Sequence, residues 1–336
     1  MDPLSQAFIG SGVAQSFSKK GVQVRQALFC GAIGGLMPDI DILIRSNIDP
    51  LKAIEYHRHF THSLFFIPFG GLFVAALLWL IFFRKNKKQK FSIIYLFSTL
   101  GYATHGLLDS CTAYGTQILW PFSDYRASWS VISIIDPLFT LPLIAFCILS
   151  YFKKERKYAR SGIYLCMIYL LYGFYNQLSA KSYILDVAKN RGHEVEKIFM
   201  NPSLANNILW RSVYKSGNNY YIDAVNVRPF RNTVFYKGSK VEAIDKELVF
   251  DKIPKGSKQR DDIRRFSHFT KGYIYLHPNS NNVIADLRYS AVPNDIESLW
   301  GIKIDEENPQ NHVKFISLRK VGSKQRQNFV GMVKGE

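Results

Sequence analysis

Long apolar runs alternate with short basic runs through the first half of the chain. A helix that crosses a bilayer needs about 20 mostly apolar residues. Four runs meet or approach that length. A fifth is interrupted by the sequence MPDID, and a shorter sixth, rich in small residues, either crosses the bilayer or lies partly in it. In chain order they are Pro3–Phe17 (the short run), Val22–Ile44 (the interrupted run), Ser63–Phe83, Phe91–Leu108, Ile134–Phe152 and Ser161–Leu178. The pattern predicts a mainly α-helical, polytopic membrane domain with five or six spans.

The pattern changes after residue 178, where the chain becomes polar and mixed in charge and has no run long enough to span. β-prone runs flank Ser216–Asn219 and Pro278–Asn282, each typical of a hairpin turn, and Val313–Leu318 adds a strand. Ser179–Asn190 reads as a helix leaving the membrane. We therefore expect a membrane domain over residues 1–178. A small soluble α+β domain, mostly antiparallel sheet, should follow over residues 179–336.

The chain has 43 Lys and Arg against 26 Asp and Glu, a net charge of +17. Such an excess is typical either of nucleic-acid binding or of the basic loops of a membrane protein. The basic runs Arg84–Lys90 and Lys153–Arg160 lie directly between apolar runs, which favours the second interpretation. We expect no nucleic-acid partner. Basic loops stay cytoplasmic. The ends of the apolar runs opposite those loops, and the C-terminal domain, are therefore expected on the extracytoplasmic side.

Ionisable side chains gather at those extracytoplasmic ends. Two carboxylates follow Pro38 so closely that they repel unless a cation lies between them. Three histidines lie in the stretch HRHFTHS, and a histidine and an aspartate spaced i, i+4 share one helical face. Helix caps, solvated loop residues and surface hydrogen bonds are the alternatives. The candidate catalytic and metal-binding residues are Asp39, Asp41, His57, His62, His105 and Asp109.

Mixed imidazole and carboxylate ligands suit zinc, with manganese or iron as alternatives. Six candidates exceed the needs of one tetrahedral ion, which points to two or three ions. Such clusters acidify bound water and stabilise displacement at phosphorus. Arg58 is the best candidate to pair with a phosphate group, because a guanidinium matches its oxygens. Tyr114 and Arg126 are expected behind it.

Other residues fit structural roles. Asp136, just before Pro137, is expected to cap a helix. Cys30, Cys147 and Cys166 lie inside apolar runs and are expected to be small buried side chains. The remaining histidines have no common spacing and are expected at the surface: His193, His268, His277 and His312. The first 20 residues lack the basic start of a signal peptide, so we expect them to be retained.

The motifs GGLMPDIDIL, HRHFTHSLFF, HGLLDSCTAYGTQILWPFSDYR and IDPLFTLPL resemble the bacterial membrane-bound metal-dependent hydrolases of the YdjM type. The resemblance covers the membrane domain and implies an enzyme of the plasma (inner) membrane. The family is distantly similar to zinc-dependent phospholipase C and P1-type nucleases, whose His-x-x-x-Asp pair His105 and Asp109 match. Relatives carry threonine and histidine where this chain has Ser5 and Gln6, so Gln6 is assigned to substrate. Relatives often have glycine at the position of His59, so His59 is a weaker candidate ligand than His57 and His62.

Three hypotheses follow for function. The first is a metal-dependent hydrolase that cleaves a phosphoester in a lipid or lipid-linked substrate at the outer membrane interface. The second is a transporter or ion relay, which predicts ionisable residues at mid-bilayer and internal repeats. Neither is evident in the sequence. The third is a non-enzymatic assembly factor with structural metals, which differs from the first only in lacking turnover.

Overall fold

The computed structural model describes residues 1–336 except 86–88, 230, 245–252, 281 and 320–321. Parts of the predicted basic run Arg84–Lys90 and of the predicted turn Pro278–Asn282 therefore lie outside the described residues. The chain divides into two compact units. The first comprises Met1–Leu43, Tyr56–Tyr175 and Leu204–Asn207, and the second comprises Ile44–Glu55, Asn176–Ser203 and Ile208–Glu336.

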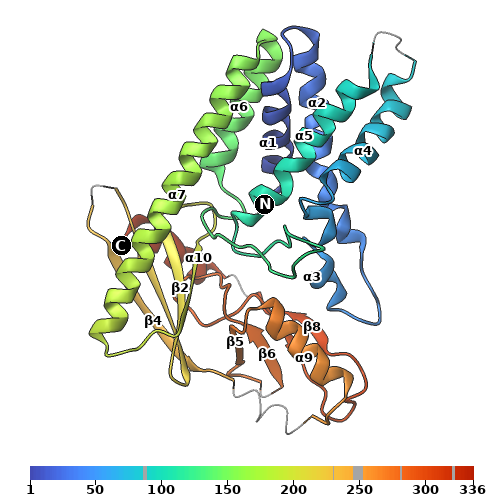
Figure 1. Ribbon diagram of the computed structural model, residues 1–336. Coiled ribbons are helices and arrows are strands. Elements are labelled where there is room, and N and C mark those ends of the chain that lie inside the picture. The colour runs from blue at the N-terminus through green and yellow to red at the C-terminus, as the bar shows by residue number, and fades with distance from the viewer. Residues whose placement is uncertain (86–88, 230, 245–252, 281, 320–321) are drawn as a thin grey trace. The chain divides into compact units, whose positions relative to one another are not determined.

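The first unit is helical (Figure 1). Its elements are α1 (Pro3–Phe17), α2 (Val22–Leu36), the 3-10 helix η1 (Met37–Leu43), the 3-10 helix η2 (Phe60–His62), α4 (Ile67–Leu78), the π-helical turn η3 (Trp79–Phe83), α5 (Phe91–Ser110), α6 (Pro137–Lys153) and α7 (Arg156–Asn190) as far as Tyr175. Asp136 caps α6, as predicted, by accepting a hydrogen bond from the Leu138 amide. Asp2 caps α1 in the same way through the Ser5 amide.

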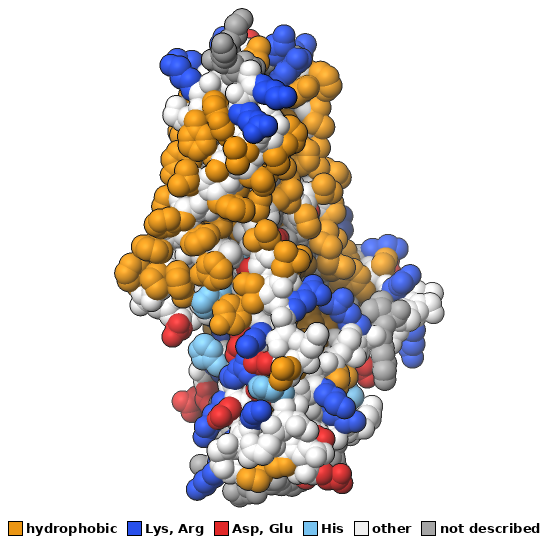
Figure 2. Space-filling model, turned by 90° about the vertical axis from the view of Figure 1, so that its right-hand side faces the viewer, with side chains coloured by type: hydrophobic (Ala, Val, Ile, Leu, Met, Phe, Trp, Pro, Cys, Tyr) orange, Lys and Arg blue, Asp and Glu red, His pale blue; other side chains and the backbone are white. Residues whose placement is uncertain are grey.

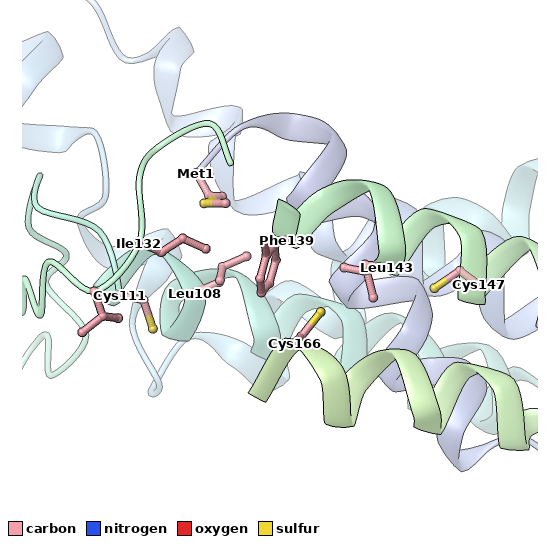
Figure 3. Close-up of a cluster of buried hydrophobic side chains, with 9 residues drawn as sticks. Met1, Leu108, Cys111, Ile132, Phe139, Leu143, Cys147 and Cys166 are labelled. Carbon is pink, nitrogen blue, oxygen red and sulfur yellow. The ribbon is translucent and has the colours of Figure 1, made fainter. Parts of the chain in front are cut away.

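Glycines let α1, α2 and α5 approach one another closely. A Cβ atom on Gly101 would lie 2.2 Å from the carbonyl oxygen of Gly31, and one on Gly10 would lie 2.5 Å from the same atom. Beside this contact lies a hydrophobic cluster that includes Phe139 and the buried thiols of Cys147 and Cys166 (Figure 3). These cysteines act as small apolar side chains, as predicted.

The prediction of five or six spans is not supported. By length and composition, Val22–Leu43 and Phe91–Ser110 are long and apolar enough to cross a membrane. The helical segments Lys52–His62 and Ile67–Phe83 meet at a bend of 87°. If this pair counts as one span, the number of candidate spans rises to three. The other predicted segments are helical, but α1 has 15 residues and α6 has 17. Tyrosines together with Asn176 and Gln177 lower the hydropathy of α7.

The outward surface of these helices is nevertheless apolar. Hydrophobic side chains gather over the helical part of the face drawn in Figure 2. Phe69 and Phe73 on α4 and Leu80 on η3 are each more than half exposed. Water-soluble monomers rarely expose a contiguous apolar patch of large area, so this surface fits contact with lipid.

The second unit contains two four-stranded sheets, both antiparallel, with strand orders β1-β2-β3-β4 and β5-β6-β7-β8. The strands are β1 (Lys197–Pro202), β2 (Leu209–Ser216), β3 (Asn219–Asn226), β4 (Val234–Glu242), β5 (Ile274–Leu276), β6 (Val283–Asp286), β7 (Trp300–Lys303) and β8 (Lys314–Ser317). The helices are α3 (Lys52–Tyr56), the end of α7, α9 (Lys258–Phe269) and α10 (Ser323–Lys334). The predicted antiparallel sheet and the predicted β2–β3 hairpin are confirmed.

Buried contacts cover the first sheet. Ala180, Ile184 and Ala188 of α7 pack with Trp210 and Tyr214 of β2. On α10, Met332 joins a separate cluster that contains Leu209 and Ala224. Neighbouring residues of a strand point to opposite faces, so Leu209 and Trp210 direct the two helices to opposite sides of the sheet.

Arg211 on β2 connects the first sheet to the loop that follows β6. Its Nε and Nη2 atoms donate to the carbonyl oxygen of Leu287 at 3.2 and 2.8 Å. Its Nη1 atom donates to those of Pro293 (2.8 Å) and Asp295 (2.7 Å). Burial lowers the pKa of Arg211 to about 10, so the side chain remains charged at neutral pH.

Replacing Arg211 with methionine is expected to destabilise the second unit. The buried carbonyl groups of Leu287 and Pro293 and the half-buried one of Asp295 lose their donor. Each unsatisfied buried group costs about 1–3 kcal/mol, so the free energy of unfolding should fall by about 3 kcal/mol. Urea unfolding of the detergent-solubilised chain, followed by tryptophan fluorescence, measures this. Lys215→Met is the control, because Lys215 lies on the same strand and only pairs with Glu196 at the surface. Equal midpoints for the two variants would contradict the assignment.

Candidate metal centre

Three segments bring the six predicted ligands to one end of the first unit. Asp39 and Asp41 lie on η1, directly after α2. His62 ends η2, and His105 and Asp109 lie in the last turns of α5. Because α2 and α5 both start at basic turns, the six residues lie at the helix ends opposite those turns. At the basic end, the Gly21 amide donates to the Lys154 carbonyl, so the α1–α2 and α6–α7 turns meet.

Local structure is irregular at both short segments. At MPDID the chain passes from α2 into the tighter 3-10 helix η1. The predicted run Ser63–Phe83 becomes helical at Ile67, and Phe60–His62 before it forms a separate 3-10 turn. The Thr61 hydroxyl in this turn donates to Asp41 Oδ2 at 2.9 Å.

Four donor atoms from Asp39, His62, His105 and Asp109 lie within 4.8 Å of one another. His62 Nε2 is 3.4 Å from Asp39 Oδ1 and 3.4 Å from Asp109 Oδ2. His105 Nε2 is 3.3 Å from Asp39 Oδ1 and 3.6 Å from Asp109 Oδ2. Ligands about 2.0–2.1 Å from a tetrahedral zinc ion lie about 3.3–3.4 Å apart. The four histidine–aspartate distances are therefore close to the spacing that such an ion requires, and the other two distances among these atoms are within 4.8 Å.

The imidazole rings of His62 and His105 are each oriented by a contact at Nδ1. His105 Nδ1 donates to the Gly35 carbonyl oxygen at 2.5 Å, and His62 Nδ1 lies 3.1 Å from Asp41 Oδ2. A carbonyl oxygen and a carboxylate oxygen only accept, so each ring carries a proton on Nδ1, and in the neutral form of the ring the lone pair is on Nε2. Among the described residues, both Nε2 atoms are buried and have no hydrogen-bond partner. Orientation of this kind is typical of metal-binding histidines.

Asp41 collects hydrogen bonds from the stretch that carries the histidines. Its Oδ1 accepts from His57 Nδ1 at 2.9 Å. Its Oδ2 accepts from the Arg58 amide and from the Thr61 hydroxyl, both at 2.9 Å. This buried carboxylate therefore fixes the backbone on which His57 and His62 lie. Asp39, Asp41 and His57 also form a second group close enough to hold an ion, and Asp39 is common to both groups.

Asp109 is oriented through its other oxygen. Gln6 Nε2 donates to Asp109 Oδ1 at 2.9 Å, and the Met1 amino group contacts the same atom. Asp109 Oδ2 faces the two histidines and is 3.0 Å from Arg58 Nε. Gln6, predicted to contact substrate, thus contacts a predicted ligand.

The remaining predicted residues surround this core. Arg58 has a positive φ of 64°, and its Nη1 atom donates to the Thr112 hydroxyl at 2.8 Å. Its guanidinium lies 4.8 Å from the ring centre of Tyr114. Arg126 Nη1 donates to the carbonyl oxygens of His57 (3.4 Å) and Gly115 (3.3 Å). His59 lies apart, with its ring 5.8 Å from that of Trp120.

Sequence reasoning missed two glycines that shape the centre. Gly35 supplies the acceptor for His105. A Cβ atom on Gly106 would lie 2.1 Å from the carbonyl oxygen of His62, so only glycine lets α5 approach η2 this closely. Their positions in the sequence were the available signal. Gly35 lies three residues before Pro38, and Gly106 directly follows the candidate ligand His105.

Comparison with known proteins gives a family and no solved structure. Residues 1–180 match the family model described as YdjM inner membrane protein. The chain is 37% identical over 111 residues to the inner membrane protein YbcI of Escherichia coli (strain K12), covering 32% of this chain and 61% of YbcI. It is 25% identical over 190 residues to the uncharacterized protein YfhP of Bacillus subtilis (strain 168), covering 56% of this chain and 55% of YfhP. No solved structure matches.

Proposed function

Because the chain belongs to the YdjM inner membrane protein family, we propose that it is an integral-membrane, metal-dependent hydrolase. Its substrate would be a phosphoester in a lipid or a lipid-linked molecule. The single observation that carries the proposal is the convergence of His62 Nε2, His105 Nε2, Asp39 Oδ1 and Asp109 Oδ2 within 4.8 Å of one another.

The donor set fits zinc, with manganese or iron as alternatives. His62, His105, Asp39 and Asp109 would hold one ion. Asp41 and His57 would join Asp39 in holding a second. A bound ion would act as a Lewis acid on the phosphoester and make water more acidic.

The chain's own residues would orient substrate around these atoms. Arg58 brings a cation next to Asp109, where it can pair with phosphate oxygens. Tyr114 supports its guanidinium, and Arg126 holds the carbonyl groups of His57 and Gly115. Asp39 is the most exposed of the four ligands, with 26% of its side chain accessible, so substrate would approach from its side.

Apolar surface near the centre supports a lipid-linked substrate. Leu43 is 72% exposed two residues after Asp41, and Phe65 is 47% exposed three residues after His62. The Phe65 ring packs 5.9 Å from that of Phe122, which is 83% exposed. These side chains would let the acyl part of a substrate remain in lipid while its phosphate reaches the ligands.

Charge supports an extracytoplasmic centre. Basic residues lie at the opposite helix ends, at Lys19, Lys20, Arg84 and Lys153. Basic loops are retained in the cytoplasm, so η1, η2 and the end of α5 would face outward. Under the same proposal α7 carries the chain outward, and the C-terminal domain is extracytoplasmic.

A non-enzymatic role is the second candidate. Structural zinc sites are closed by four protein ligands, whereas catalytic sites keep an open position. The four donors of this centre would complete the coordination of one ion, as in a structural site, whereas turnover would need the second ion or the exchange of one ligand for substrate.

Metal analysis together with turnover tests the proposal. Detergent-purified protein is expected to contain at least about one zinc or manganese ion per chain. It should hydrolyse bis-(p-nitrophenyl) phosphate or extracted phospholipids, and chelator should abolish hydrolysis until metal is restored. Metal without turnover would favour the structural role. Protein purified without metal that also fails to bind added zinc would refute both.

A further inference from the structure

The segment Ile44–Glu55 connects the two stretches of chain that carry most of the centre. Asp41 precedes it by three residues and His57 follows it by two. The segment itself belongs to the second unit. Its conformation therefore bears on both ends of the connection, one leading to η1 and the other to η2.

Arg265 of α9 binds this segment at two points. Its Nε and Nη2 atoms donate to the two Glu55 carboxylate oxygens at 2.7 and 2.6 Å. Its Nη1 and Nη2 atoms donate to the two oxygens of Asp49 at 3.2 and 3.0 Å. Nη1 also donates to Asp262 Oδ1 at 2.7 Å. A guanidinium has five N–H donors, and these contacts use all of them.

The surroundings hold the arginine in place. Asp262, one helical turn earlier on α9, is buried, and its Oδ2 accepts from His312 Nδ1 at 2.9 Å and from the Val313 amide at 3.0 Å. His312, predicted to be a surface residue, is therefore half-buried in this network. Asp49 in turn accepts from the Leu51 amide, which orders the start of α3.

The group formed by Asp49, Asp262 and His312 is close enough to hold a metal ion. Arg265 already pairs with both carboxylates, and both Asp262 oxygens have donors. The half-buried Arg265 guanidinium among these acids supplies the positive charge that a metal ion would supply. The cluster is therefore explained as an ion-pair network.

We propose that Arg265 is a positioning residue for the metal centre. By binding Asp49 and Glu55 with paired hydrogen bonds, it holds the connecting segment in one conformation. Asp41 and His57 are thereby kept at the spacing in which they contact each other. Bidentate arginine–carboxylate pairs set geometry as well as affinity, and functional groups need placement to about 0.5 Å. The proposal rests on the proposed function for its metal, but the positioning of Asp41 and His57 is measurable without one.

Glu55→Gln is the sharpest variant, because it keeps side-chain size and leaves the Arg265 pairs with Asp49 and Asp262 intact. Asp49→Asn removes the other pair, and Arg265→Lys retains the charge without the paired geometry. Arg264→Gln is the matched control, since Arg264 is the adjacent arginine and pairs at the surface with Asp261. All variants are made in the full chain and purified in detergent.

Two readouts are needed. Hydrogen exchange by mass spectrometry, on metal-free protein, is expected to show faster exchange in peptides that cover residues 41–62 in Glu55→Gln and Asp49→Asn. The Arg58 amide, which donates to Asp41, is the reporter. Peptides from β2 and β3 should be unchanged. Zinc affinity should fall about tenfold, as for other residues that orient ligands, and Arg264→Gln should match the wild type in both readouts.

Unchanged exchange over residues 41–62 in both variants would overturn the proposal, as would exchange that rises equally across the second unit. If the wild type binds no zinc, the proposed function fails. The exchange comparison then still decides whether Arg265 positions Asp41 and His57.

Discussion

Replacing His105 and Asp109 together with alanine is expected to remove the bound metal, weakening zinc affinity by more than about 100-fold. Loss of a single residue that only orients a ligand typically costs 10–100-fold in affinity, and here two of four donors disappear. Both residues lie on α5 and contribute atoms 3.6 Å apart. Inductively coupled plasma mass spectrometry of the purified variant measures metal per chain, and phosphoester hydrolysis should fall in parallel.

The control removes the same residue types elsewhere. His268 and Asp261 lie on α9 and are exposed, so His268→Ala with Asp261→Ala should keep full metal content. Because the double replacement in α5 also removes the carboxylate that Arg58 and Gln6 contact, Asp39→Asn provides a milder test at the partly exposed ligand. Full metal retention in both site variants would refute the assignment of these ligands.

Gly106→Ala is expected to disrupt the centre without altering any ligand. The new Cβ atom would lie 2.1 Å from the His62 carbonyl oxygen, whereas a carbon–oxygen contact is normally about 3.3 Å. Backbone must therefore move by roughly 1 Å, more than the 0.5 Å that a preorganised site tolerates. Zinc affinity should fall by at least about tenfold, and overpacking should cost about 1–3 kcal/mol of stability.

Gly71→Ala separates these two effects. It creates a comparable clash, 2.2 Å from Thr99 Oγ1, at a contact of α5 with α4 in place of η2. Its stability, followed as a thermal melting temperature, should fall by a similar amount, but zinc affinity should remain near that of the wild type. Equal loss of affinity in the two variants would show that helix packing in general, and not the placement of His62, controls metal binding.

Part of the centre could be predicted from sequence because helical spacing is local. His105 and Asp109 share a face of α5 whatever the rest of the chain does, since residues four apart are neighbours on a helix. Basic and apolar runs likewise placed the polar residues at one set of helix ends. The β2–β3 hairpin followed from its turn, and the capping role of Asp136 from the proline behind it.

Roles that depend on distant segments could not be predicted in this way. Gln6 and Asp109 are 103 positions apart, yet share a hydrogen bond. Asp41 was expected to be a ligand, and in the structure it also contacts His57, His62 and the Arg58 amide between them. Arg265 and Glu55 are 210 positions apart. No local spacing rule connects such pairs.

The sequence by itself determined which side chains can bind a metal, which runs form helices and which strands pair as hairpins, because each depends on neighbours a few residues away. Tertiary structure alone decided which oxygen of each carboxylate faces the centre, which ring nitrogen of each histidine is left for an ion, and where glycine is required. Those choices depend on helices packed at backbone contact, where a displacement of one ångström changes which atoms meet.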